Sequence, residues 1–274
     1  MEVTLLGTGD TTGTPTPGCD CATCARAVDR GVERSRFSVH IRNERTGESL
    51  LVDTSPDLRS QFLAHDCPLP DAAVITHIHF DHLDGLGHAY RLLDHLPVFA
   101  GDETDPETGE SVAQTVRRRY DYLDTVSVHP RSPFDPFETC GFEVTLVPVD
   151  HPPLLCYGLA VEDPVTGAKL SVSGDTSYDV PDDSRAALAD PDLCLADGIV
   201  TAAHCEYHPK GGAHHDADGV ARTFGTKHMT IEGAVEFGAD LAADRTRVVH
   251  VSHFLDAGEA FVEPLAVDGE RYDL

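Results

Sequence analysis

The sequence predicts an α/β fold in which two mixed β-sheets are flanked by helices. Short apolar runs typical of strands recur along all 274 residues, and the second half repeats the plan of the first, with strands and occasional helices. Strands are therefore more numerous than a simple parallel, doubly wound sheet would use. Because no composition shift or linker divides the chain, we expect one domain over residues 1–274, with a sizeable core.

The first half is expected to begin with a strand and a loop. After the strand at 2–6, the Thr-, Pro- and Gly-rich stretch from Asp10 to Gly18 predicts a loop. Pro56 is expected to open a helix at about 57–65, with Ser55 as a candidate cap, and apolar spacing predicts another helix from Leu83 to Asp94. The remaining elements are strands at 36–42, 49–53 and 72–76, then a short strand and a helix near 107–121.

The second half alternates in the same way until a long polar segment interrupts it. Strands are expected at 139–149, 155–161, 168–173, 193–201 and 247–251, and helices at 183–189 and 230–241. The segment 202–227, which contains His204, His208, His214 and His215, is expected to be a surface insertion or a lid. We assign no role to its histidines.

The charge of the chain is its unusual bulk property. There are 47 acidic and 20 basic residues, a formal net charge of -27, and only three of the basic residues are lysines. Acidic residues spread along the whole chain suggest a surface adapted to high salt, because a Debye length of about 3 Å in molar salt screens their repulsion. Greater thermal stability in dilute buffer than in molar KCl would contradict this halophilic hypothesis. A basic partner is a weaker explanation because the acids do not cluster, and nucleic acid is an unlikely partner.

Nothing in the sequence predicts a membrane or secreted protein. The start lacks a basic region, and no segment approaches the roughly 18 apolar residues of a membrane span, so a cytoplasmic location is expected. Eight cysteines are too sparse for a disulfide scaffold. The sequence carries no signal for oligomeric state, which leaves a homodimer open.

The densest group of potential metal ligands follows the apolar run 72–75. His77, His79, Asp81 and His82 fall within six residues there. Imidazoles and a carboxylate suit zinc, manganese or iron, and a strand that ends in a tight loop can direct them at one point. A solvated histidine-rich tract is the alternative, but this loop lies mid-chain behind a buried strand.

Three further residues end apolar strands. His151 follows Val149, Asp175 follows the strand to Val172, and His250 follows Val249. Singly, each is more often a hydrogen-bonded histidine or a capping aspartate than a ligand. Together with the loop they make seven ligands, the number that two metals sharing one carboxylate require.

At this point the sequence resembles the metallo-β-lactamase superfamily, whose binuclear hydrolases carry His-x-His-x-Asp-His, a lone His, a lone Asp and a final His in that order. The resemblance implies an αββα sandwich and two divalent ions, zinc or manganese. Asp53 matches the family's buried aspartate, which hydrogen-bonds around the ligand histidines. The resemblance assigns His77, His79 and His151 to one metal, Asp81, His82 and His250 to the other, and Asp175 to both.

Two metals favour a phosphoester substrate. A water shared by two ions is deprotonated near neutral pH, and both ions can hold a phosphoryl oxygen during in-line displacement. Metal-bound hydroxide would then be the nucleophile, and Asp81 a catalytic ligand. A single-metal β-lactam hydrolase is disfavoured because Asp81 and His82 complete a second site.

The cysteine cluster indicates a structural zinc. Cys19, Cys21 and Cys24 supply three thiolates, and His253, three residues after His250, is the candidate fourth ligand. The chain is similar here to the phosphoribosyl 1,2-cyclic phosphate phosphodiesterases. The shared residues are Leu6-Gly7-Thr8-Gly9, Gly13-Thr14-Pro15, Gly18-Cys19-Asp20-Cys21, Cys24 and the His-x-Ser-His of residues 250–253. A disulfide or a chance cluster is the alternative.

His228 matches the position where that subfamily has a histidine facing the phosphate. It precedes an expected helix that Thr230 can cap, and it could stabilise phosphorane charge or protonate the leaving oxygen. A surface histidine before a helix is the alternative. The leading hypothesis is a phosphodiesterase acting on a small cyclic phosphate.

Two rival functions stay open. One is a transfer-RNA 3′-processing endonuclease. This function predicts an arm rich in Gly, Pro and basic residues, which the sequence lacks. The other is a non-hydrolytic member, either a relative from pyrroloquinoline quinone assembly, which can share the cysteine pattern, or a zinc-binding module that has lost catalysis. Intact ligands at all seven positions argue against such a loss.

Overall fold

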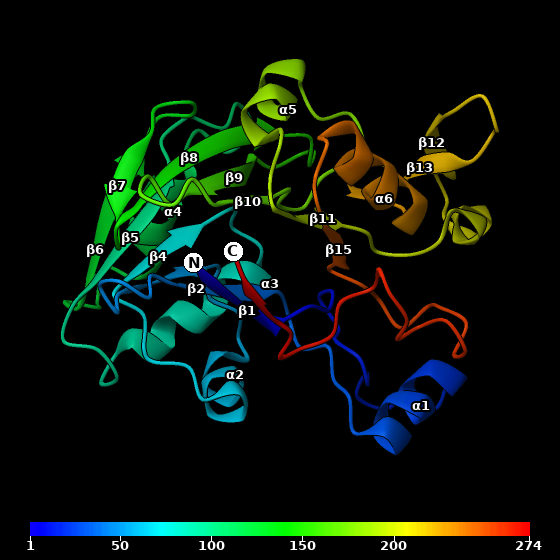
Figure 1. Cartoon of the computed structure of the whole chain (residues 1–274), viewed down its shortest axis with the longest axis horizontal. Helices are drawn as coiled ribbons and strands as arrows, with labels where there is room; N and C mark the ends of the chain where they lie inside the picture. Colours follow the sequence, from blue (N-terminus) through cyan, green and yellow to red (C-terminus); the bar gives the residue numbers. More distant parts are fainter.

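Two large mixed β-sheets pack face to face, and helices cover their outer faces in the computed structural model, which describes residues 1–274 (Figure 1). The first sheet has the order β16-β1-β2-β3-β4-β5-β6. Neighbours are antiparallel from β16 to β3 and parallel from β3 to β6. Its strands are β1 (Glu2–Gly7), β2 (Ser38–Arg42), β3 (Ser49–Val52), β4 (Ala72–Ile75), β5 (Leu96–Gly101), β6 (Val126–Arg131) and β16 (Arg271–Asp273).

The second sheet has the order β15-β11-β10-β9-β8-β7. Here β15, β11 and β10 are parallel, and the remaining neighbours are antiparallel. Both sheets therefore combine the two pairing types, which confirms the predicted mixed sheets. Its strands are β7 (Phe137–Thr139), β8 (Phe142–Val149), β9 (Cys156–Glu162), β10 (Lys169–Val172), β11 (Leu193–Asp197) and β15 (Thr246–Val249).

The core lies between the two sheets. One cluster of 40 buried apolar residues includes Leu5 and Val74 from the first sheet and Leu159 from the second. A smaller cluster joins the second sheet to the helix that carries Phe237. Helices α2 and α4 contact the first sheet, and α5 and α6 contact the second (Figure 1). The helices are α1 (Ala22–Arg30), α2 (Leu58–His65), α3 (Phe80–Leu83), α4 (Val112–Arg119), α5 (Asp182–Leu188) and α6 (Ile231–Asp240).

The topology brings the strand-end residues to one edge of the sandwich. Strands β3 and β4 run parallel in the first sheet, and β10, β11 and β15 run parallel in the second. Strand β8 is antiparallel to β9, which is antiparallel to β10, so β8 runs in the direction of β10. Since the carboxyl ends of parallel strands meet at one edge, the polar residues that follow them gather there.

The predicted helix from Leu83 to Asp94 is wrong. The four-residue α3 is followed by a 3-10 helix, η1 (Asp84–Ala89). Gly85 lies so close to the backbone of Ser55 that an ideal Cβ would come within 1.8 Å of that carbonyl oxygen, and its N–H donates to Thr54 O at 2.9 Å. This close approach, which only glycine permits, replaces the helical continuation.

The expected cap of α2 is also wrong. Asp57, and not Ser55, occupies the N-cap position, and its side chain makes no capping bond. Ser55 Oγ instead accepts from Asp57 N at 3.1 Å and donates to Gln61 Oε1 at 2.9 Å. Ser55 thus orders the turn before the helix.

The polar segment 202–227 contains regular structure. It holds the 3-10 helix η2 (Ala202–Tyr207) and most of a three-stranded antiparallel sheet of β12 (Gly212–His215), β13 (Ala221–Phe224) and β14 (His228–Met229). Strand β13 contacts α6, and its residues 221–223 are buried, whereas residues 214–219, from the end of β12 into the following turn, are exposed. The segment is therefore anchored on α6 at the side of the molecule where β12 and β13 are labelled (Figure 1).

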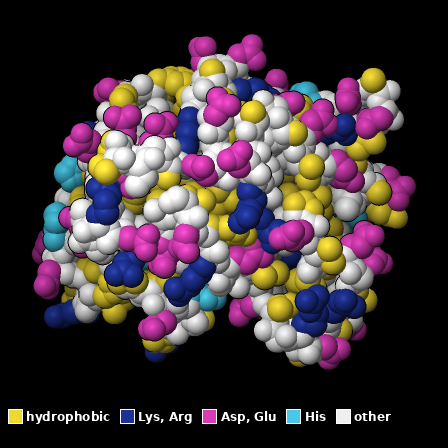
Figure 2. Space-filling view, viewed as in Figure 1, with side chains coloured by type: hydrophobic (Ala, Val, Ile, Leu, Met, Phe, Trp, Pro, Cys, Tyr) yellow, Lys and Arg dark blue, Asp and Glu magenta, His cyan; other side chains and the backbone are white.

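The surface shown in Figure 2 carries acidic side chains in many separate places, with basic side chains between them. The acids on this face form no single patch, in keeping with their spread along the sequence. The structure contains no helix with the length and apolar character that crossing a membrane requires.

Candidate metal centre

The structure brings all seven predicted metal-ligand side chains to the shared edge of the two sheets. Their ligand atoms form two adjacent groups, within each of which all atoms lie within 4.8 Å of one another. The first group is His77, His79, His151 and Asp175, and the second is Asp81, His82 and His250.

Asp175 lies between the two groups. Its Oδ2 is 3.7 Å from Nε2 of His77 in the first group, and 3.3 Å and 3.4 Å from Nε2 of His82 and His250 in the second. One carboxylate oxygen therefore faces histidines of both groups.

The histidines of the first group point bare ring nitrogens at one another. His77 Nε2 lies 2.9 Å from His79 Nδ1, and His151 Nε2 lies 3.4 Å from the same atom. Burial lowers the pKa of His77 well below its usual value and the pKa of His151 to about 3. These imidazoles are neutral at neutral pH, which is the form that binds metal.

The second group combines a buried carboxylate with imidazole nitrogens that have no hydrogen-bond partner. Nε2 of His82 and of His250 are buried and make no hydrogen bond. Burial opposes protonation of His82, yet Asp175 and Asp53 outweigh it and raise its pKa well above the usual value. Buried carboxylates and unsatisfied imidazole nitrogens that face one point fit a divalent cation, since buried polar atoms otherwise find partners.

Asp53 orients histidines of both groups through a relay of hydrogen bonds. Its Oδ2 accepts from His82 Nδ1 at 2.6 Å and from Thr76 Oγ1 at 2.8 Å, and its Oδ1 accepts from Thr76 N at 2.8 Å. Thr76 Oγ1 lies 3.1 Å from His77 Nδ1. Because the Thr76 hydroxyl donates to Asp53, it accepts from His77, so both His77 and His82 carry their proton on Nδ1 and leave Nε2 free.

Backbone and hydroxyl groups hold two other members. His151 Nδ1 donates to the carbonyl of Lys227 at 3.1 Å, which again leaves Nε2 free. Thr11, in the loop after β1, donates from Oγ1 to Asp81 Oδ2 at 2.6 Å. The loop that leads to the cysteines therefore contacts the metal centre directly.

His228 also lies at the centre. Its ring stacks on His250 at 5.0 Å with an interplanar angle of 14°, and it lies 5.1 Å from the ring of His151. The Nδ1 atom contacts Asp197 Oδ2 at 3.0 Å. The side chain is 17% exposed, so it lies at the mouth of the centre.

Asp197 is a functional candidate that the sequence analysis missed. It ends β11 and is buried, and its Oδ2 accepts from Thr176 N at 2.9 Å as well as from His228. Its Oδ1 lies 3.6 Å from His250 Nδ1. The signal was present, because Asp197 ends an apolar strand as Asp53 does, but it lies within the longer apolar run 193–201.

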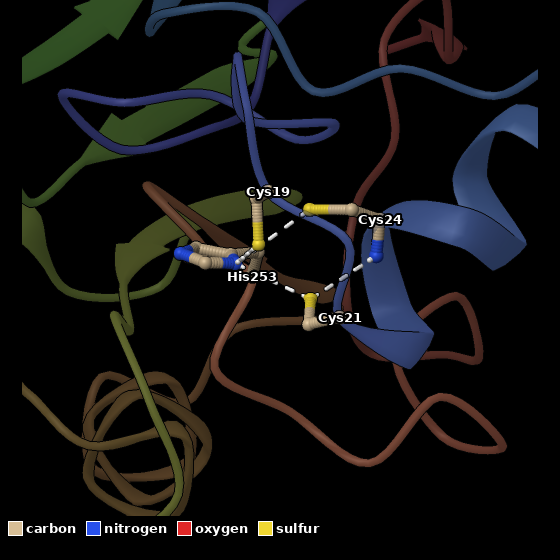
Figure 3. A group of neighbouring side chains, drawn as sticks. All are labelled: Cys19, Cys21, Cys24 and His253. Carbon is tan, nitrogen blue, oxygen red and sulfur yellow. Dashed lines mark hydrogen bonds between the residues drawn. The ribbon is translucent and has the colours of Figure 1, made fainter.

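The predicted structural-zinc residues come together (Figure 3), with Cys19 and Cys21 half-buried and Cys24 and His253 buried. His253 Nδ1 lies 3.4 Å from Sγ of Cys19 and of Cys21, and 3.6 Å from Sγ of Cys24. A tetrahedral zinc with bonds of about 2.3 Å to sulfur and 2.0–2.1 Å to nitrogen separates those atoms by about 3.5 Å. The four residues therefore fit a zinc ion.

The local fold stabilises the thiolate of Cys21. Cys21 caps α1 and accepts from Cys24 N at 3.4 Å, and Cys24 accepts from Thr16 N at 3.3 Å. Although burial opposes ionisation, the bond from Cys24 N and the contacts with the side chains of His253, Cys19 and Cys24 lower the pKa of Cys21 to about 6, whereas burial raises the pKa of Cys24 to about 11. All eight cysteines of the chain are free of disulfides.

Two backbone hydrogen bonds tie the cysteine loop to the strand end that bears both histidines. Val251 N donates to Thr8 O at 3.0 Å, and Asp10 N donates to Val251 O at 3.4 Å. Val251 lies between His250 of the metal centre and His253 of the cysteine cluster.

Comparison with known proteins agrees with this architecture. The family described as the beta-lactamase superfamily domain matches residues 48–251. A crystal structure described as a new diphosphatase from the PhnP family is 26% identical, with a TM-score of 0.76, and the match covers 100% of this chain and 97% of that one.

Two other matches are more limited in what they show. Zn(2+)-bound PqqB from Methylobacterium extorquens is 22% identical with a TM-score of 0.77, covers 100% of both chains, and shows a shared fold. An octanoyltransferase of Porphyromonas gingivalis is 27% identical over 276 residues, which cover 97% of this chain. The chain spans 49% of the length of that protein, so the activity in its name belongs to a protein about twice as long.

Proposed function

Because this chain belongs to the beta-lactamase superfamily, we propose that it is a metal-dependent hydrolase of phosphoric diesters that acts on a small cyclic phosphate. The observation that carries the proposal is the position of Asp175 Oδ2, within 3.7 Å of histidines from both ligand groups. A centre of two adjacent ligand groups with one shared carboxylate suits in-line displacement at phosphorus.

The ligand assignment follows the two groups. His77, His79 and His151 would hold one ion, Asp81, His82 and His250 the other, and Asp175 both. Two divalent ions, zinc or manganese, would supply activation of water and neutralisation of charge on the phosphoryl group. The cysteine cluster would hold a third, structural ion.

The residues of the chain itself prepare the centre and move a proton. Asp53 and the carbonyl of Lys227 accept at Nδ1 of His82 and of His151, which directs Nε2 of each ring at the metal position. Hydrolysis adds a hydroxyl group to phosphorus, breaks a P–O bond and requires a proton on the departing oxygen. His228 is placed to donate that proton, since the contact of its Nδ1 with Asp197 fixes the orientation of its ring at the centre.

A diphosphate is the second candidate substrate. The similar structure described as a diphosphatase favours it, because a phosphoanhydride can be cleaved at the same centre. The fold alone is shared with PqqB, so a non-hydrolytic role has weaker support.

The test is hydrolysis by the metal-loaded protein of bis(p-nitrophenyl) phosphate, a cyclic phosphate and a diphosphate. We expect His77→Ala to lose nearly all activity, and His228→Ala to lose about 10²- to 10⁴-fold in kcat. His95→Ala, at an exposed histidine, is the matched control. Activity on diesters that survives His77→Ala would contradict the proposal, and activity on the diphosphate alone would replace it with the second candidate.

A further inference from the structure

A row of aromatic rings borders the metal centre on the side of the segment 202–227. We call His204, Tyr207, Phe224 and Phe254 the aromatic row. The ring centroid of His204 lies 5.1 Å from that of Tyr207, 6.4 Å from that of Phe224 and 5.4 Å from that of Phe254. Tyr207 is 72% exposed and Phe254 is 54% exposed, so the rings contact one another at the surface.

One end of the row lies beside His228. Phe224 on β13 is directly opposite His228 on β14 in the antiparallel pair. Side chains of directly opposed residues share one face of a sheet, with Cβ atoms about 4.5–5.5 Å apart. Since the ring of His228 stacks on His250, the row begins next to the ligand groups. Its other end, Phe254, follows His253 of the cysteine cluster.

The rings are held in place by their surroundings. His208 packs edge-on against Phe224 at 4.7 Å, and Gly225 leaves room for that imidazole, because a Cβ there would come within 2.5 Å of it. The backbone of Phe254 donates to Ser252 Oγ at 3.2 Å. Little ordering of the Phe224 ring is therefore required when a ligand binds.

The same segment carries basic side chains as well as acidic ones. Of the three lysines in the chain, Lys210 and Lys227 lie between η2 and β14. Lys227 precedes His228, and its carbonyl accepts from His151. Lys227 therefore lies at the metal centre, and a lysine in this position suits an anionic ligand.

We propose that the aromatic row binds a planar ring of the substrate, so that the phosphoester cleaved at the metal centre is a nucleotide in which the base stacks beside His228. Base stacking on aromatic side chains is favourable and tolerant of base identity. The inference rests on the proposed phosphoester hydrolysis and narrows its substrate class, because a sugar cyclic phosphate without a base would leave the row unused.

The kinetic test compares a substrate that has a ring with one that lacks it. The ratio of kcat/KM for adenosine 2′,3′-cyclic phosphate to kcat/KM for glycerol 1,2-cyclic phosphate is measured for each variant. We expect Tyr207→Ala and Phe254→Leu each to lower this ratio about tenfold. Phe134→Leu is the matched control, because Phe134 is 45% exposed and lies between β6 and β7, away from the row. Unchanged ratios in both row variants would overturn the inference.

A binding test separates this inference from the proposed activity. Titration calorimetry on the zinc-loaded protein compares adenosine 5′-monophosphate with ribose 5-phosphate. We expect tighter binding of the nucleotide, and about tenfold loss of that preference in Tyr207→Ala and Phe254→Leu. Equal zinc content shows that Phe254→Leu leaves the cysteine cluster intact. A preference for the nucleotide without any hydrolysis would refute the proposed function and support the aromatic row, whereas hydrolysis without this preference would refute the row alone.

Discussion

Replacing Asp53 by asparagine tests how the metal centre selects the protonation of its histidines. Asp53 Oδ1 accepts the backbone N–H of Thr76, so in Asp53→Asn the amide oxygen keeps that place and the NH2 group takes the position of Oδ2. An amide NH2 only donates, so His82 must accept at Nδ1. The hydroxyl of Thr76 must accept as well, and it then donates to His77 Nδ1.

The expected magnitude follows from this reversal. His77 and His82 would both carry their proton on Nε2, the atom that faces Asp175, so each ligand group loses one nitrogen donor. Loss of such an outer carboxylate typically costs about 10- to 100-fold in metal affinity, or about 1.4–2.7 kcal/mol. Since His79, His151 and His250 do not contact Asp53, we expect weaker binding of both ions and not their complete loss.

Competition with a chelator, followed by elemental analysis, measures the affinity for each ion. Asp163→Asn is the matched control, because Asp163 is also a buried carboxylate but holds the β9–β10 turn and Arg45. Wild-type affinity for both ions in Asp53→Asn would refute the relay. An equal loss in the control would show a general effect of removing a buried charge.

Two further predictions concern groups outside the centre formed by the two ligand groups. His40 is buried on β2, and burial lowers its pKa to about 4. Because this lies below the unfolded value of about 6.5, the fold should lose up to about 3 kcal/mol as the pH falls between those values. His40→Gln should show less of this loss in urea unfolding, and identical pH dependence in both proteins would contradict the reasoning. Separately, Cys24→Ser should lower the zinc content by one ion per chain and leave ions bound to the two ligand groups. Cys194→Ala, at a buried cysteine outside the cluster, should leave the zinc content unchanged. Full zinc content in Cys24→Ser would exclude a zinc site formed by the three cysteines and His253.

Most of the metal centre could be predicted because its members follow apolar strands. Strand periodicity places His77, His151, Asp175 and His250 at strand ends, and the topology brings those ends to one edge. Asp197 also ends a strand at this edge, but the sequence does not indicate where that strand ends, because Gly198-Ile199-Val200 continue the apolar run beyond β11.

Other features depend on contacts between distant parts of the chain. The leucines from residue 83 have helical spacing, yet Gly85 packs against the backbone of Ser55, a contact that no local pattern reveals. Likewise, Thr11 has no local sign of its contact with Asp81, 70 residues away. The aromatic row joins η2, β13 and the loop after β15, so its rings meet only after folding.

The four residues from His250 to His253 connect the metal centre to the cysteine cluster, which bears on how the two sites bind ions. This segment contributes His250 to the metal centre and His253 to the cysteine cluster. The loop after β1, which pairs with it, contains Thr11, which contacts Asp81, and the cysteines, which contact His253. An ion at the cysteine cluster would therefore restrict the same backbone that the other centre needs ordered. By thermodynamic linkage, if an ion at one site raises the affinity of the other site by some factor, an ion at the other site raises the affinity of the first by the same factor. Removal of an ion from the cysteine cluster would then weaken the binding of ions at the strand ends.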